Sequence, residues 1–237
     1  LEIPVMVLDR PNPNGHFVDG PVLKKQYASF VGMQPIPVVH GMTMGEYASM
    51  LNGEGWLEDS LRCRLKVVQM KNWTHETDYS LPVPPSPNLP NDAAVRLYPS
   101  LCFFEGADVS VGRGTEYPFQ CFGFPGNKSG DYKFTPMSIP GKAKNPPYLN
   151  QECIGKNLSK NATIKRYDKL HLEWLIEAYN SFAVKEKFFN AFFLKLAGTP
   201  ELQQQIEAGL SADEIREGWK VDLEKFKKIR SRYLLYP

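Results

Sequence analysis

The 237-residue sequence predicts an α/β protein, in which the end of a parallel sheet is followed by a mixed strand-and-loop region and C-terminal helices. Three observations predict this class. The chain opens on an uninterrupted apolar run, Ile3 to Leu8, which is typical of a strand buried on both faces of a parallel sheet. Its middle holds short apolar runs separated by proline and glycine. From Asp168 onward, apolar residues recur at helical spacing.

The first strand lacks an obvious partner in the residues that follow it. Parallel strands need helical crossovers, and the stretch before Pro37 is broken repeatedly by proline and glycine. The sequence starts at Leu1 without a signal-peptide pattern. We therefore expect the chain to start within a longer protein, and the partners of Ile3–Leu8 to lie in an upstream segment that this sequence does not include.

Polar residues follow this strand at its carboxyl end, where open α/β sheets bind ligands. They are Asp9, Arg10 and Asn12, and we predict that they face a ligand. The alternative is that Asp9 and Arg10 cap the strand and pair with each other for structural reasons.

A helix is predicted after the short apolar run Pro37–His40. Thr43 and Glu46 have the spacing of a capping box, and the helix that they open stops near Gly53. Glu46 then has two interpretations, as a functional carboxylate or as the group that satisfies the Thr43 backbone N–H. His40, at a strand end, is either a ligand-binding imidazole or a structural hydrogen-bonding group.

A proline-rich segment, Leu81–Gln120, follows a predicted strand at Leu61–Met70. Its prolines fix the backbone and remove hydrogen-bond donors, so it cannot be a central strand. We predict that it forms one wall of a polar pocket. The polar residues that it would present are Asn88, Asn91, Glu105 and Arg113. The alternative is a rigid surface loop between two strands.

The remaining elements are predicted from local patterns. We expect a short helix at Ala93–Cys102 interrupted at Pro99, and strands at Val109–Val111, Phe119–Phe122, Phe134–Ile139 and Asn161–Arg166. We expect helices capped by Asp168, over Phe188–Leu196, after Thr199-Pro200, and after the Ser211–Glu214 capping box.

Composition limits the partners and cofactors. A net charge of +2 is too small to indicate a nucleic-acid partner, and no apolar run approaches the ~18 residues of a membrane span. The four cysteines lack zinc-site spacing, so we expect isolated, mostly buried thiols rather than a disulfide, and no metal. The sequence has no P-loop, GxGxxG, GxSxG or HExxH motif, so no cofactor is expected. The oligomeric state stays open.

The candidate residues are a mixture of carboxylates, amides, an imidazole and guanidinium groups on loops. Glycan sites use this mixture, with carboxylates acting on the glycosidic oxygen and the attacking water, and aromatic rings stacking on sugar faces. Trp56, Trp73 and Tyr117 are the aromatic candidates. The same residues occur on many polar loops, so the pattern alone defines no activity.

Longer motifs resemble a known family. They are VLDRPNPNG from Val7, SFVGMQPIPVVHGMTMGEYA from Ser29, LPVPPSPNLPN from Leu81, YPSLCFFEG from Tyr98, FTPMSIPGKAKNP from Phe134 and the terminal WxxDLxxFxxxRxxYLLYP from Trp219. Together they cover nearly the whole chain and resemble the exo-acting β-N-acetylmuramidase family, long catalogued as a domain of unknown function.

This resemblance implies an enzyme that releases N-acetylmuramic acid from the non-reducing end of peptidoglycan fragments. It implies a Rossmann-like region, of which residues 1–57 would be the C-terminal part, and a mixed α+β region, residues 58–237, that completes the cleft. The family carries an acidic catalytic candidate in a Pro-Glu-His-Gly motif, which this chain does not contain. We therefore expect the chain alone to be catalytically incomplete. A peptidoglycan substrate implies a periplasmic, cell-surface or secreted protein.

Within this chain, we predict that Glu46 and Glu105 act as acid/base or water-orienting carboxylates. The predicted substrate-binding residues are Asp9, Arg10, Asn12, His40, Asn88, Asn91 and Arg113. An arginine suits the lactyl carboxylate of muramic acid, because a guanidinium binds that group bidentately. The alternatives are a non-catalytic peptidoglycan- or carbohydrate-binding protein on the same scaffold, and a nucleotide-binding enzyme, which the lack of a glycine-rich loop disfavours.

Overall fold

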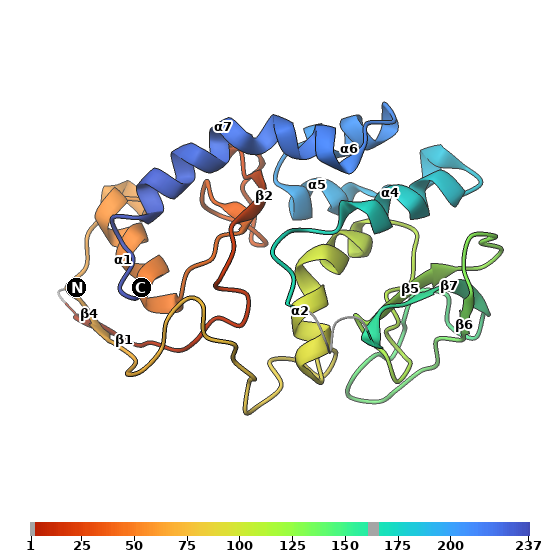
Figure 1. Cartoon of the computed structure of the whole chain (residues 1–237), viewed down its shortest axis with the longest axis horizontal. Helices are drawn as coiled ribbons and strands as arrows, with labels where there is room; N and C mark the ends of the chain where they lie inside the picture. Colours follow the sequence, from red (N-terminus) through yellow and green to blue (C-terminus); the bar gives the residue numbers. More distant parts are fainter. Residues whose placement is uncertain (1–2, 161–165) are drawn as a thin grey trace.

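The computed structural model describes residues 3–160 and 166–237, and its elements confirm the α/β class (Figure 1). The strands are β1 (Val5–Leu8), β2 (Asp19–Val22), β3 (Pro37–Val39), β4 (Leu65–Val68), β5 (Cys121–Phe124), β6 (Tyr132–Phe134) and β7 (Cys153–Asn157). The helices are α1 (Met44–Glu54), α2 (Asp92–Leu101), α4 (Leu172–Ser181), α5 (Ala191–Ala197), α6 (Glu201–Glu207) and α7 (Ala212–Arg230). The predicted strand at Asn161–Arg166 falls almost wholly outside the described residues.

The first strand has its partner downstream. β1 pairs in parallel with β4, in the register Val5↔Leu65, and α1 lies between them in the sequence and contacts both. That further partners lie upstream stays a prediction, but the expectation that the strand has no partner in the residues that follow it is wrong. So is the expectation of burial on both faces, since Met6 is 60% and Leu8 72% exposed. Of the four strand residues, only Val7 is partly buried.

The other strands form two antiparallel sheets, β2–β3 and β5–β7–β6. β7, the central strand of the second sheet, was missed by the sequence analysis. It pairs Gly155 with Gly123, and a Cβ atom at Gly155 would lie 1.8 Å from the Phe122 carbonyl oxygen. This close approach requires glycine, which is a weak strand former and hides the strand in the sequence.

Three predicted strands differ from the structure. At Val109–Val111 there is a single bridge, Ser110↔Gly123, because the chain turns away at Gly112 with a φ of 75°. The strand expected at Phe119–Phe122 is β5, two residues later. The strand expected at Phe134–Ile139 is β6, which ends at Phe134 before Pro136, a residue that cannot donate to a ladder.

Helix α2 runs through Pro99 without interruption, contrary to the sequence prediction. A proline at this position leaves the carbonyl of Val95 without its helical donor. In the structure, the Asn14 side-chain amide donates to that carbonyl at 3.0 Å. A residue far away in the sequence therefore supplies the hydrogen bond that proline removes.

The C-terminal helices follow the predicted order, but two of them start later than predicted, and α5 begins at Ala191 rather than Phe188. α4 begins at Leu172 and Asp168 does not cap it. Instead, the backbone N–H groups that precede it donate to Asp19 and to Ser100, at 2.8 and 2.9 Å. The capping box of α7 is confirmed, with both reciprocal hydrogen bonds present.

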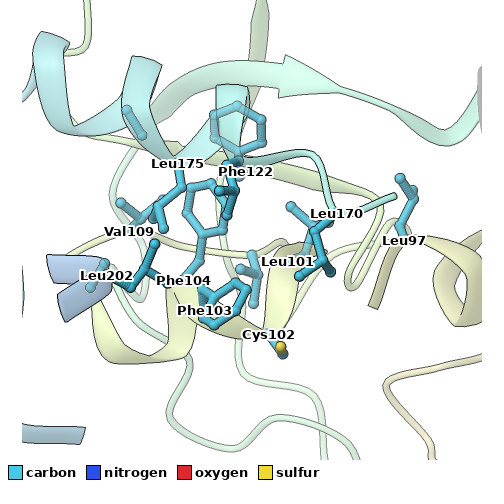
Figure 2. Packing of buried hydrophobic residues seen from close by; sticks show 14 of the residues in the cluster. Leu97, Leu101, Cys102, Phe103, Phe104, Val109, Phe122, Leu170, Leu175 and Leu202 are labelled. Atoms are coloured by element: carbon cyan, nitrogen blue, oxygen red, sulfur yellow. The ribbon is translucent and has the colours of Figure 1, made fainter. Parts of the chain in front are cut away.

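Most of the apolar core lies between α2, the 3-10 helix Cys102–Gly106, and helices α4 to α7 (Figure 2). Phe103 and Phe104 are fully buried in it. A much smaller cluster, Met42, Met50 and Phe226, packs α7 against α1. All four cysteines are free thiols, three of them buried, as predicted. Among the described residues, no helix combines the length and apolar character that a membrane span requires.

Candidate functional site

A cavity of about 450 Å³ lies where the N-terminal strands meet the helical core. Strands β2 and β3, the loop at 30–36, α1, α2 and the end of α5 all line it. Two hollows of similar volume, about 480 and 500 Å³, lie elsewhere on the molecule, but no aromatic side chain lines either of them. We call the first the His40 cavity, after the imidazole in its wall.

His40 directly follows β3, and its protonation state follows from its contacts. Nδ1 accepts a hydrogen bond from the Met42 backbone N–H at 3.1 Å, and the ring stacks on Tyr47, with ring centroids 5.6 Å apart. Burial, with a smaller contribution from the Arg230 charge, lowers the pKa of His40 to about 4. The imidazole is therefore neutral and carries its proton on Nε2, which has no partner among the described residues.

Two phenols add further neutral donors to this wall. Burial, helped by Cys102 and the Glu105 charge, raises the pKa of Tyr98 to about 12, and burial also raises the pKa of Tyr47. Both hydroxyls therefore keep their protons at neutral pH. Neither has a hydrogen-bond partner among the described residues, so both are available to a ligand.

Lys195, near the end of α5, is the one charged side chain among the described residues that line the His40 cavity. It is exposed and has no ion-pair partner in the described part of the chain. No described carboxylate lines the cavity. The cavity therefore favours a ligand that is rich in hydrogen-bond acceptors or carries a negative charge.

Asp9 lies outside this cavity and is saturated with donors. Its carboxylate accepts hydrogen bonds from the Thr43 and Tyr236 hydroxyls, both at 2.7 Å, and from the backbone N–H groups of Gly45 and Arg10. This favours the structural alternative. The Arg10 side chain itself is exposed and makes no ion pair among the described residues.

Asn12 is likewise used by the fold. Its side-chain amide donates to the Met42 carbonyl and accepts from the Asn14 backbone N–H, both at 2.9 Å. Asn12 therefore stabilises the loop beside His40 and does not reach into the cavity.

Glu46 is fully buried and completes the predicted capping box with Thr43. Its carboxylate also faces His75 Nε2 and the Leu235 backbone N–H, each at 2.9 Å. Burial on its own raises the pKa of Glu46, but the hydrogen bonds from His75, Thr43 and Leu235 outweigh burial and hold the pKa below its usual value. The geometry favours the structural alternative, and a catalytic role of Glu46 stays a prediction.

Glu105 and Arg113 form an ion pair with a 2.5 Å contact, and their side chains are 23% and 32% exposed. The Arg113 guanidinium lies over the Phe119 ring at 5.0 Å, and that ring contacts Tyr98 at 5.1 Å. The pair therefore lies behind Tyr98, the residue that connects it to the His40 cavity. Of the two predicted catalytic carboxylates, Glu105 is the one with solvent access.

The proline-rich segment does not form the predicted wall with its asparagines. Asn88 is buried and donates to the Lys142 carbonyl at 3.0 Å, and Asn91 caps α2 by accepting from the Ala94 N–H. The part of Leu81–Gln120 that does reach the cavity is Tyr98 and Cys102. Asp9, Arg10 and Asn12, which follow β1, do not line the cavity, so this segment does not meet them there; Tyr98 and Cys102 instead meet His40, which follows β3.

The predicted aromatic candidates also lie elsewhere. Trp73 is buried against Tyr236, with ring centroids 5.0 Å apart, and neither Trp56 nor Tyr117 lines the cavity. Besides Tyr47 and Tyr98, the aromatic residue that lines the cavity is Phe30, which is 99% exposed. Its signal in the sequence is the apolar Phe-Val pair directly before a glycine.

Within residues 3–160 and 166–237, no three potential metal ligands cluster together. What the fold does assemble is a cavity in the size range of ~300–1,000 Å³ found for small-ligand sites, with a mostly apolar lining that also holds neutral donors, one cation and an exposed aromatic ring. A largely apolar lining with a few convergent polar groups is typical of small-ligand sites.

Comparison with protein-family models identifies the family of the chain. The model described as "Exo-beta-N-acetylmuramidase NamZ, N-terminal" matches residues 1–93, and its C-terminal counterpart matches residues 96–236. The chain therefore belongs to the exo-β-N-acetylmuramidase NamZ family. The predicted division at residues 57 and 58 stays a prediction.

Individual relatives give the same result. The chain is 37% identical over 251 residues to "Peptidoglycan beta-N-acetylmuramidase NamZ" of Bacillus subtilis strain 168, with 99% of this chain and 60% of that protein covered. Two solved DUF1343 family proteins of Bacteroides fragilis NCTC 9343 are similar in structure. They have TM-scores of 0.93 and 0.77 at 53% and 25% identity. The chain spans about two thirds of each solved chain, and 60% of the curated relative.

Proposed function

We propose that the chain is the sugar-binding part of an exo-β-N-acetylmuramidase, which releases N-acetylmuramic acid from the non-reducing end of peptidoglycan fragments. The observation that carries this is the 37% identity to the B. subtilis enzyme across 99% of the chain. The His40 cavity supports it, because its donors and its cation suit a sugar with carbonyl, hydroxyl and carboxylate acceptors.

Each cavity group has a place in this proposal. The Nε2 proton of His40 and the hydroxyls of Tyr47 and Tyr98 donate to sugar oxygens. Lys195 supplies the positive charge for the lactyl carboxylate that distinguishes muramic acid from glucosamine. Arg113, the arginine predicted to bind the lactyl carboxylate, forms an ion pair with Glu105 instead.

Glycoside hydrolysis uses two carboxyl groups, one on each side of the scissile bond. No described carboxylate lines the cavity, and Glu105 is held behind Tyr98. We therefore assign binding and orientation of the sugar to the cavity, and an acid/base or water-orienting role of Glu105 stays a prediction from the sequence. The cavity lining does not supply the second carboxylate.

The setting of the reaction follows from the substrate. A peptidoglycan fragment is met outside the cytoplasm, so a periplasmic, cell-surface or secreted protein that acts in cell-wall recycling belongs to this proposal. The parallel pair β1–β4 with its crossover helix α1 supports a Rossmann-like sheet as the scaffold of the catalytic region.

Calorimetry with this chain tests the binding part of the proposal. We expect N-acetylmuramic acid to bind and N-acetylglucosamine, which lacks the lactyl group, to bind about 10-fold more weakly. Lys195→Gln should remove that difference, whereas Lys220→Gln, an exposed lysine on α7, should preserve it. Equal affinity for both sugars in the unmodified chain would contradict the assignment of Lys195.

Turnover decides between the enzyme and the non-catalytic alternative. We expect a longer form of this protein, as long as the B. subtilis relative, to hydrolyse a chromogenic N-acetylmuramide and release its dye. Binding without any release by that longer protein would favour a peptidoglycan-binding protein on the same scaffold.

A further inference from the structure

The loop before β3 contains a tight turn at Ser29–Gly32. Ser29 N–H donates to the Gly32 carbonyl at 2.8 Å, and Gly32 N–H donates to the Ser29 carbonyl at 3.1 Å. The Ser29 hydroxyl also accepts from Val31 N–H at 3.2 Å. Phe30 and Val31 are therefore the two tip residues of a turn closed by reciprocal hydrogen bonds, and the ring of Phe30 is presented on a rigid support.

The turn is also seated on the body of the protein. A Cβ atom at Gly32 would lie 2.9 Å from the side chain of Leu23, a core residue, so the backbone packs directly on it. Beyond that contact the tip faces solvent. Phe30 is 99%, Val31 49% and Met33 66% exposed, although each lines the His40 cavity.

This exposure is not the ordinary scatter of apolar residues over a surface. Single exposed apolar side chains are normal, but three in and directly after one braced turn, all lining the His40 cavity, form a patch. An aromatic ring in such a position binds the apolar C–H face of a pyranose, and the ring of Phe30 is free to do so on almost all of its surface.

We propose that Phe30 is the platform for a second sugar, the hexosamine attached to C1 of the sugar that fills the His40 cavity. This inference rests on the proposed function, because it assumes that the cavity holds the terminal sugar. The donors His40 and Tyr98 line the cavity itself, whereas the apolar turn stands at its rim, where the leaving sugar of an exo-acting enzyme emerges.

A second copy of the chain is a weaker occupant for this patch. A stable interface between proteins buries about 800 Å² on each partner. The exposed apolar patch consists of three side chains from one short turn, which is far smaller than that. A sugar ring matches its size, and the patch is continuous with the cavity.

Calorimetry with a monosaccharide and a disaccharide tests the platform. The ligands are N-acetylmuramic acid and the β-1,4-linked disaccharide that carries it at the non-reducing end. In Phe30→Ala, we expect the disaccharide to bind about 3- to 10-fold more weakly, and the monosaccharide to bind within about twofold of the unmodified chain. Phe30→Trp should restore disaccharide binding. Phe192→Ala, which removes a 38% exposed ring that does not line the cavity, is the matched control.

Each other outcome overturns the proposal. Unchanged disaccharide affinity in Phe30→Ala would remove Phe30 from the site. An equal loss for both ligands would assign Phe30 to the terminal sugar. Self-association of the unmodified chain that disappears in Phe30→Ala, measured by light scattering, would assign the patch to a second copy. If the unmodified chain binds neither ligand, the result contradicts the proposed function, and the proposal for Phe30, which rests on that function, is contradicted as well.

Discussion

Around α1 the chain is held by hydrogen bonds to two carboxylates, the buried Glu46 and the partly buried Asp9, whereas around α2 and α4 it is held by packed aromatic and aliphatic side chains. The first region has three buried apolar residues in its cluster and an exposed parallel strand pair. Two hydrogen bonds hold its C-terminal tail in place. The Leu235 backbone N–H donates to Glu46, and the Tyr236 hydroxyl donates to Asp9. The second region has the continuous core of Figure 2. Hydrogen-bonded carboxylates therefore stabilise the first region, whereas apolar packing stabilises the second.

The comparison explains why two residues predicted to be functional make structural contacts. Asp9 was predicted to be functional because it follows a strand, and Glu46 because it is a carboxylate at the start of a helix. Both are saturated by protein donors, since a region with little apolar core uses them to join distant segments. Glu105, beside the large core, keeps solvent access instead.

The largest expected effect comes from the apolar region. Phe104→Ala should lower the free energy of unfolding by about 3–5 kcal/mol, because it leaves a cavity in a fully packed core. Chemical denaturation measures this loss, and Phe192→Ala, at an exposed ring, is the control. A loss below about 1 kcal/mol would mean that the core is loosely packed.

Glu46→Gln tests the polar region, with an expected destabilisation of about 2–4 kcal/mol. A glutamine places an N–H₂ group against one of the donors that now face the carboxylate, either Thr43 N–H on one oxygen or His75 and Leu235 on the other. Chemical denaturation measures this change in the free energy of unfolding. Normal stability together with lost turnover in a protein of the relative's length would contradict the structural assignment and restore Glu46 as a catalytic group.

The pH dependence of stability tests His40. Its folded pKa of about 4 lies below the ordinary value of 6.5, so the unfolded chain binds more protons between these values. The contribution of His40 is therefore complete above pH 6.5 and is lost as the pH falls toward 4. His40→Gln should flatten the unfolding free energy across that window. An unchanged slope would mean that His40 is protonated in the folded protein.

The smallest effect on stability is expected for Glu105→Gln, below about 1 kcal/mol, because its ion pair with Arg113 is partly exposed. The Glu105 charge is one cause of the raised pKa of Tyr98, so that pKa should fall in the variant. Ultraviolet titration of the phenol measures it. In the longer protein, turnover should fall at least ~100-fold if Glu105 acts in acid/base catalysis, and near-normal turnover would remove it from the mechanism.

Local signals in the sequence were sufficient for some elements and not for others. The capping boxes at Thr43 and Ser211 are contained in four residues each, and both were predicted correctly. Helix α2 through Pro99 depends on Asn14, 81 residues from Val95, and no local pattern reveals such a contact. The same holds for the site. His40 was found at its strand end, but Lys195 reaches the cavity only through the packing of α5 against it.

The central claim is that the His40 cavity, and not the carboxylate network around Glu46, binds the sugar. Titration of the isotope-labelled chain with N-acetylmuramic acid, followed by nuclear magnetic resonance, tests it directly. The account predicts the largest shifts at His40, Tyr47, Tyr98 and Lys195. Shifts centred on Glu46, His75 and Leu235, with the cavity signals unmoved, would contradict it.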